Sequence, residues 1–321
     1  MKKYLIIFTI CLLGACSSDN IKNNQNTGTI QNSGTLENKS GTGNEEFGQT
    51  KLLKEINYSN LVDKSSQEEI KNALKEAGVD EKEISEFLKN VDTFNKTVEN
   101  KTLLSTGFAK TNILPAYDED FIAQKWDEKN KDFKGNNCRI TTFGLLKNFI
   151  NVKNPSNKLD TENLAFDYES IKGGKIFDEK EKKIFDNFFA QIPSPNTQNT
   201  SELVKVVQDD WKKKGIEFTN PNAKVISVFL QDSIDEKSKK LFIGHIGVLL
   251  PTKDSKFIFI EKLAFQKPYQ ALKFDSKRDL SDYLMATYDV DTTGESARPF
   301  VLENYDLIDG YSANPNTIIK N

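Results

Sequence analysis

Three apolar stretches between residues 223 and 263 constrain the fold more than any other feature of the chain. They cover residues 223–230, 241–250 and 256–263, and each has the length and aliphatic content of a buried β-strand. The links between them are short and polar, whereas parallel strands need a crossover of about a dozen residues or more. The stretches therefore predict an antiparallel meander.

Amphipathic helices are predicted ahead of this meander. Residues 66–69, Ser-Gln-Glu-Glu, have the form of a capping box, and apolar residues at helical spacing follow them up to residue 77. A second helix is expected over residues 80–94. Residues 51–110 should thus form a helical hairpin, and residues 111–321 should form the main domain. Helices followed by a meander place the chain in the α+β class.

The amino-terminal segment predicts export. Lys2 and Lys3 precede an apolar stretch that is too short to cross a bilayer as a mature helix, and small residues follow it just before Cys16. Residues 1–15 are therefore expected to be a signal peptide. Residues 16–50 are rich in Asn, Gly, Ser and Thr and nearly free of aromatic residues, so they are expected to be a disordered tether.

The residues Leu13-Gly14-Ala15-Cys16 resemble the lipobox of bacterial lipoproteins. The resemblance implies cleavage before Cys16 and lipidation of that residue. Acyl chains on Cys16 would anchor the protein to a bacterial cell membrane or outer membrane, with the folded part on the extracytoplasmic side. The alternative is an ordinary signal peptide with an incidental cysteine.

Charge and histidine content argue against two classes of function. The net charge is -3, from 44 basic and 47 acidic residues, and no basic patch stands out, so nucleic-acid binding is not expected. One histidine and one mature thiol make a poor zinc site, so no metal is expected, and no phosphate-binding glycine loop is present. We expect the protein to work without a cofactor.

The single thiol and the single imidazole suggest a catalytic pair. Once the leader is set aside, Cys138 is the only free thiol, and His245 is the only histidine of the chain. Cys138 follows the turn residues 135–137 and begins an apolar helix. A thiol at a helix amino terminus has a lowered pKa, and the Cys138 amide there can donate to an oxyanion.

The meander supplies a base and a carboxylate. His245 lies in its second stretch and Glu261 in its third. A turn centred on Lys253 would place His245 directly opposite Glu261, at a distance where side chains interact. The sequence thus predicts Cys138 as nucleophile, His245 as general base and Glu261 as the group that orients the imidazole.

Three further residues are weaker candidates for substrate binding. Arg139 and Arg298 could each hold a substrate carboxylate, but the alternative is an ordinary surface ion pair, which we favour for Arg139. Asn137, like Asn136, is expected to form the turn before the helix. Its side-chain amide could alternatively assist the oxyanion.

Two resemblances extend these inferences. Residues 244–248, Gly-His-Ile-Gly-Val, followed by a second strand, resemble the histidine hairpin of the NlpC/P60-type cell-wall peptidases. That family is papain-like and carries its cysteine at the start of a buried helix, the place that Cys138 occupies here. The whole chain resembles bacterial lipoproteins with a domain of unknown function of the DUF4300 type. The peptidase resemblance implies a papain-like α+β fold with a buried nucleophile helix.

The resemblance also implies a function. It points to a membrane-anchored cysteine hydrolase that cleaves an amide bond, with cell-wall peptide from peptidoglycan as the leading substrate class. One alternative is an acyltransferase or protease that uses the same three residues on another exported substrate. The other is a non-enzymatic, surface-binding lipoprotein in which Cys138 and His245 are core residues.

Overall fold

The computed structural model describes residues 52, 53, 55–100, 102–232 and 238–317. These residues belong to one compact unit, Glu46–Asn321. The expected signal peptide 1–15, the expected tether 16–50 and Cys16 lie outside the described residues. Among the residues that the structure describes, no helix is both long enough and apolar enough to cross a bilayer.

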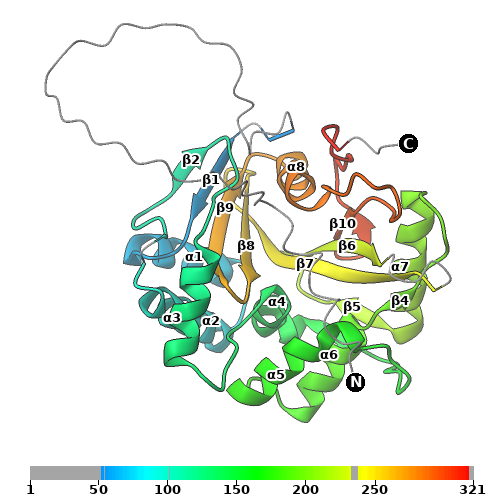
Figure 1. The fold of residues 1–321 in the computed structure, drawn as a ribbon, viewed down its shortest axis with the longest axis horizontal. Coiled ribbons are helices and arrows are strands. Elements are labelled where there is room, and N and C mark those ends of the chain that lie inside the picture. Colours follow the sequence, from blue (N-terminus) through cyan, green and yellow to red (C-terminus); the bar gives the residue numbers. More distant parts are fainter. Residues whose placement is uncertain (1–51, 54, 101, 233–237, 318–321) are drawn as a thin grey trace, which may run out of the picture. The chain divides into compact units, whose positions relative to one another are not determined.

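An antiparallel sheet runs through the unit (Figure 1). Its described strands are β1 (Ile56–Ser59), β2 (Ala109–Thr111), β4 (Ile192–Pro193), β6 (Lys224–Asp232), β7 (Lys240–Pro251), β8 (Phe257–Ala264), β9 (Lys267–Phe274), β10 (Phe300–Glu303) and β11 (Asp306–Leu307). They lie in the order β11-β10-β6-β7-β8-β9-β1-β2, and β4 pairs with β7. A separate pair is formed by β3 (Ile150–Val152) and β5 (Ile216–Phe218).

Helices cover both faces of this sheet. The described α-helices are α1 (Lys64–Glu76), α2 (Glu81–Thr97), α3 (Glu119–Lys129), α4 (Cys138–Leu146), α5 (Ala165–Gly174), α6 (Glu179–Phe189), α7 (Thr200–Lys214) and α8 (Lys277–Tyr288). One apolar core joins α1 to α7 with one face of the sheet. A second core lies on the opposite face, under α8. The fold is therefore mixed α+β, built on an antiparallel sheet.

The predicted meander is confirmed, since β6, β7 and β8 pair antiparallel in chain order. The two predicted helices of residues 66–94 are confirmed as α1 and α2, but α1 begins at Lys64 with Asp63 as its N-cap, so the predicted capping box at Ser66 is wrong. The structure adds β1 and β2 on either side of that hairpin, and β1 pairs with β9 of the main sheet. The sequence did not predict β9 because Pro268, at its start, is more often a sign that a strand has ended.

The predicted register of the β7–β8 hairpin is wrong by two residues. Glu261 is opposite Gly247 rather than His245, because the hairpin turn centres on Asp254 and not on Lys253. A shift by an even number of residues keeps every side chain on its face of the sheet. His245 and Glu261 therefore remain on one face, as diagonal neighbours on adjacent strands.

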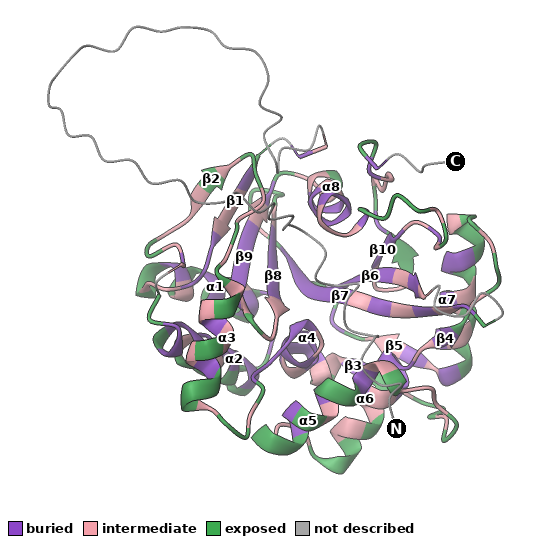
Figure 2. Cartoon of the chain, in the orientation of Figure 1, coloured by how far each residue is buried: buried purple, intermediate pink, exposed green. Residues whose placement is uncertain are grey.

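Strands β7 and β8 separate beyond the Gly247–Glu261 pair. The last pair of this ladder is Gly247–Glu261, and β4 pairs with β7 only at Leu241 and Lys240. Helix α4, which is largely buried, lies against β7 and β8 at this place (Figures 1 and 2). Its Thr142 hydroxyl donates to the Ile246 carbonyl at 3.2 Å, so the helix supplies a hydrogen bond where the neighbouring strand is missing.

A β-bulge lies in the same part of β7. The pairing with β6 shifts register between Val228 and Phe229, which leaves Gly244 as the extra residue immediately before His245. Bulges bend a strand and redirect the following side chains, and they often lie beside functional sites. The extra residue breaks the in–out alternation of side chains along β7. Ile243 and Ile246 therefore both face the core around α4, while the His245 ring lies against Tyr288 of α8.

Gly247 should be indispensable for the close packing of the hairpin. A β-carbon at this residue would lie 2.4 Å from the Phe259 ring and 2.6 Å from the Ile260 carbonyl oxygen. We expect Gly247→Ala to lower the free energy of unfolding by about 1–3 kcal/mol, because the backbone oxygen cannot move without loosening the strand pair. The free energy is measured by chemical denaturation.

Gly144→Ala is the matched control. Gly144 lies in α4 and its added β-carbon would meet nothing within 4 Å. Alanine is the better helix former, so this change should raise the free energy of unfolding by about 0.5–1 kcal/mol. Equal effects of the two substitutions would contradict the packing that we describe.

Candidate active site

Cys138 is the first residue of α4, as the sequence predicted. Gly135 adopts a positive φ of 90° in the preceding turn, a conformation that favours glycine. Asn137 is the N-cap, and its side-chain oxygen accepts from the Ile140 amide at 3.0 Å. Cys138 is 6 % exposed. Its thiol thus lies at the positive end of a buried helix, where an anion is stabilised.

His245 and Glu261 form a direct contact on the sheet. The Nε2 atom of His245 lies 2.5 Å from Oε2 of Glu261, and both side chains are fully buried. The Tyr288 ring, at the end of α8, stacks on the imidazole with 4.9 Å between ring centroids. Because Nε2 is occupied by Glu261, Nδ1 is the ring nitrogen left for the thiol.

The pKa values of Cys138 and His245 shift in opposite directions. Burial raises the pKa of the Cys138 thiol, but a hydrogen bond with His245 and the positive charges of His245 and Arg139 outweigh it, so the pKa is lowered. Burial lowers the pKa of His245. Hydrogen bonds with Cys138 and Glu261, together with the Glu261 charge, reverse this effect and raise the pKa to about 9. These shifts favour a thiolate and an imidazolium at neutral pH.

The residues on either side of Cys138 are fastened to one carboxylate. Asp167, buried on α5, accepts from the Asn137 side-chain amide at 2.8 Å and from Arg139 at 2.9 Å. Arg139 also donates to the Ile243 carbonyl of β7 at 3.0 Å. Its ion pair, expected at the surface, is partly buried, since the Arg139 side chain is only 12 % exposed. Asp167 therefore fixes the start of α4 between α5 and the sheet.

Sequence reasoning did not find Asp167. It lies about thirty residues after Cys138 in a segment without a recognisable motif, and the chain contains 47 acidic residues. Its partners are defined only by the packing of α5 beside α4. The structure thus shows that Asn137 and Arg139, on either side of Cys138, are both held by Asp167.

Arg298 is not brought to Cys138, His245 or Glu261. It donates to Asp289 at 3.0 Å, to the Asn314 carbonyl at 3.0 Å and to the Thr317 carbonyl. These contacts fasten the end of the described chain to the C-cap of α8. The arginine is therefore engaged in holding two segments together.

A buried lysine, Lys262, lies on the same side of the sheet as Cys138. Lys262 donates to the carbonyls of Ala264, at 2.7 Å, and Lys267, and its ammonium lies 3.9 Å from the centroid of the Phe94 ring. Burial holds its pKa well below the ordinary value, while the charge of Cys138 acts in the opposite direction. Lys262 was not singled out from the sequence, because nothing distinguishes it from the many surface lysines.

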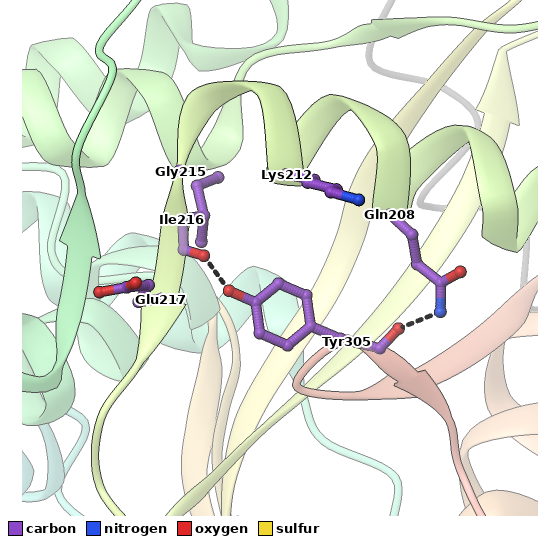
Figure 3. A pocket seen from close by; sticks show the side chains of 6 residues that line it. All are labelled: Gln208, Lys212, Gly215, Ile216, Glu217 and Tyr305. Atoms are coloured by element: carbon purple, nitrogen blue, oxygen red, sulfur yellow. Dashed lines mark hydrogen bonds between the residues drawn. The ribbon is translucent and has the colours of Figure 1, made fainter.

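Two hollows of the described structure lie away from these residues. One of about 370 Å³ is lined by residues of α7 and β5 and by Tyr305, whose hydroxyl donates to the Ile216 carbonyl (Figure 3). Another, of about 240 Å³, is lined by residues that include Leu249 and Lys277. Neither is lined by Cys138, His245 or Glu261. Within the described part of the chain, no cluster of three or more His, Cys, Asp or Glu side chains could hold a metal ion.

Comparison with protein families places this site in a known domain. A family model described as "Domain of unknown function (DUF4300)" matches residues 57–308. The chain belongs to the DUF4300 family. Searches of the curated proteins and of the solved structures each found no significant match. Cys138, His245, Glu261 and Asp167 all lie inside the matched range, so the candidate site is part of the DUF4300 domain itself.

Loss of the Asp167 charge should destabilise the DUF4300 domain. Asp167→Asn keeps the size of the side chain but leaves the Arg139 guanidinium without its anion in a mostly buried place. We expect the free energy of unfolding to fall by about 3 kcal/mol, as for other buried ion pairs that lose one partner. Chemical denaturation measures the change.

The exposed pair of Lys71 and Glu68 on α1 supplies the control. Glu68→Gln removes one charge from that pair, and it should change the free energy of unfolding by less than about 0.5 kcal/mol. A similarly small effect of Asp167→Asn would show that the clamp contributes little to the fold.

Proposed function

We propose that this DUF4300 protein is a membrane-anchored, extracytoplasmic cysteine hydrolase that cleaves an amide bond. The observation that carries the proposal is the Cys138–His245 pair, in which a helix amino terminus and a buried imidazole shift the two pKa values toward the thiolate and imidazolium forms. Glu261 occupies the other ring nitrogen of His245. This arrangement, together with the histidine hairpin, supports a papain-like core.

The proposed reaction proceeds through a thioester. The Cys138 sulfur attacks the carbonyl carbon, and the Cys138 backbone N–H donates to the developing oxyanion. His245 then gives its proton to the leaving nitrogen as the C–N bond breaks, which leaves an acyl group on sulfur and a neutral imidazole. A water molecule, deprotonated by His245, attacks the thioester; the C–S bond breaks, the acid product leaves, and the thiolate–imidazolium pair is restored. Glu261 stabilises the imidazolium in both half-reactions.

The leader motif supplies the proposed location and substrate. Lipidation of Cys16 would hold the domain against the extracytoplasmic side of a membrane, within reach of the cell wall. Cell-wall peptide is therefore the substrate class that we propose. The partner implied by the anchor is the membrane itself.

Burial of the site favours a second candidate. Cys138 is 6 % exposed and His245 is 1 % exposed. A substrate carbonyl can reach the sulfur only if nearby side chains move aside. If they do not, the same residues are core elements of a non-enzymatic surface lipoprotein. Reactivity of the thiol distinguishes the two functions.

Alkylation of Cys138 should be fast and should depend on His245. The full chain with Cys11→Ser and Cys16→Ser has one thiol, so uptake of iodoacetamide at pH 7 reports on Cys138 alone. His245→Ala removes the positive charge that stabilises the thiolate, and we expect the rate to fall about tenfold or more. Mass spectrometry follows the reaction. A thiol that reacts only after denaturation would favour the non-enzymatic candidate.

Hydrolysis should require Cys138 and should decline in alkali. With purified peptidoglycan fragments, Cys138→Ala should abolish product formation, whereas Glu261→Gln should only slow it. The rate should fall as pH rises through about 9, because His245 then loses the proton that the leaving group needs. Chromatography of the released peptides measures both effects. Full activity of Cys138→Ala would exclude the thiol as nucleophile, and fast alkylation without cleavage would exclude the substrate.

A further inference from the structure

One oxygen of Glu261 faces His245, and the other faces a tyrosine. The Tyr283 hydroxyl of α8 donates to Oε1 of Glu261 at 2.6 Å, while Oε2 lies against the imidazole. We propose that Tyr283 is a positioning residue that holds the Glu261 carboxylate oriented toward His245. The inference rests on the proposed function, because the carboxylate matters only if His245 is a catalytic base. The contacts then run from the Cys138 thiol through His245 and Glu261 to Tyr283 in the second core.

The carboxylate needs this donor because it is sealed from water. Glu261 is completely buried, and among the described residues its hydrogen bonds come from His245 and Tyr283. Gln270 lies opposite Glu261 on β9, but it makes no hydrogen bond to the carboxylate, and its side-chain oxygen has no partner. A buried ionised group without enough donors is costly, and bonds to a charged acceptor are stronger than neutral ones.

Tyr283 is suited to be a permanent donor. Burial and the nearby Glu261 charge raise its pKa well above the ordinary value, so the hydroxyl keeps its proton throughout the working pH range. Its ring is 2 % exposed and packs against Phe274 with 5.7 Å between centroids. The hydroxyl is therefore held in one place by the second core of the molecule.

Helix α8 supports the catalytic base at two points. Tyr283 holds the carboxylate, and Tyr288, five residues later, stacks on the His245 ring. The other titratable group whose charge acts on Glu261 or Tyr283 is Tyr117, which precedes α3. Burial raises the pKa of Tyr117, so its phenol stays neutral at working pH. The groups of the site whose pKa values shift toward the thiolate and imidazolium forms are thus Cys138 and His245.

The single histidine makes a direct test possible. If the full chain, with Cys11→Ser and Cys16→Ser, is labelled with ¹⁵N-histidine, the imidazole signals come from His245 alone. The titration should have a basic step near pH 9, where the imidazolium loses its proton.

Tyr283→Phe should move this step to lower pH. Removal of the hydroxyl lets the Glu261 carboxylate turn away from the imidazole and weakens the bond that raises the pKa of His245, so the imidazolium should lose its proton about one pH unit lower. Tyr283→Leu also lacks the donor and should shift the step in the same direction, which provides a second variant if the first does not fold.

Tyr311→Phe is the matched control. It removes a tyrosine hydroxyl that donates to the Pro299 carbonyl at 2.8 Å and does not touch Glu261. The titration step of His245 should be unchanged in this variant. A step that stays in place in Tyr283→Phe, or moves equally in Tyr311→Phe, overturns the proposal. The readout needs no substrate, so a protein that shows the shift but cleaves nothing would retain the positioning role and refute the hydrolase.

Discussion

The separation of β7 from β8 is the constraint on which the site depends. Two paired strands satisfy each other's backbone groups, and a strand that loses its neighbour needs other partners for them. Here the amino-terminal half of α4 supplies them through Thr142 and Arg139, which donate to carbonyls of β7. The same insertion brings the start of the helix to the edge where His245 lies. Cys138 and His245 thus meet because the sheet is open at that point.

The site concentrates charge in a place that water does not reach. Asp167 and Arg139 form one pair beside Cys138, and His245 and Glu261 form another. Isolated, each charge would be expensive to bury, whereas pairs with good hydrogen bonds offset much of that cost. The two pairs therefore fix the positions of the charges, but they contribute less to the free energy of unfolding than apolar side chains of the same size would.

The sequence was sufficient for the parts of this site that depend on local pattern. Cys138 was identifiable from the turn and helix around it, and His245 because no other histidine exists. Glu261 could be identified because side chains alternate between the two faces of a strand. The predicted register was wrong by two residues, and an even shift leaves each side chain on the same face.

Other parts depend on tertiary packing and have no such signal. Asp167 and Tyr283 do not differ in sequence from the other aspartates and tyrosines of the chain. Their contacts arise only because α5 and α8 pack beside the site. Strand β1 is four residues long, too short for its period to be read. Its role in the sheet became visible only through its pairing with β9.

The folded unit extends past both limits of the family match. The match covers residues 57–308, yet Leu53 and Ile56 lie before it in the second core. After it, the backbone amide of Asn314 donates to Asp289 at 2.8 Å, beside the end of α8. A fragment cut at the family boundaries would lose part of the layer that carries Tyr283 and Tyr288. The range that the family model matches in this chain is therefore shorter than the folded unit.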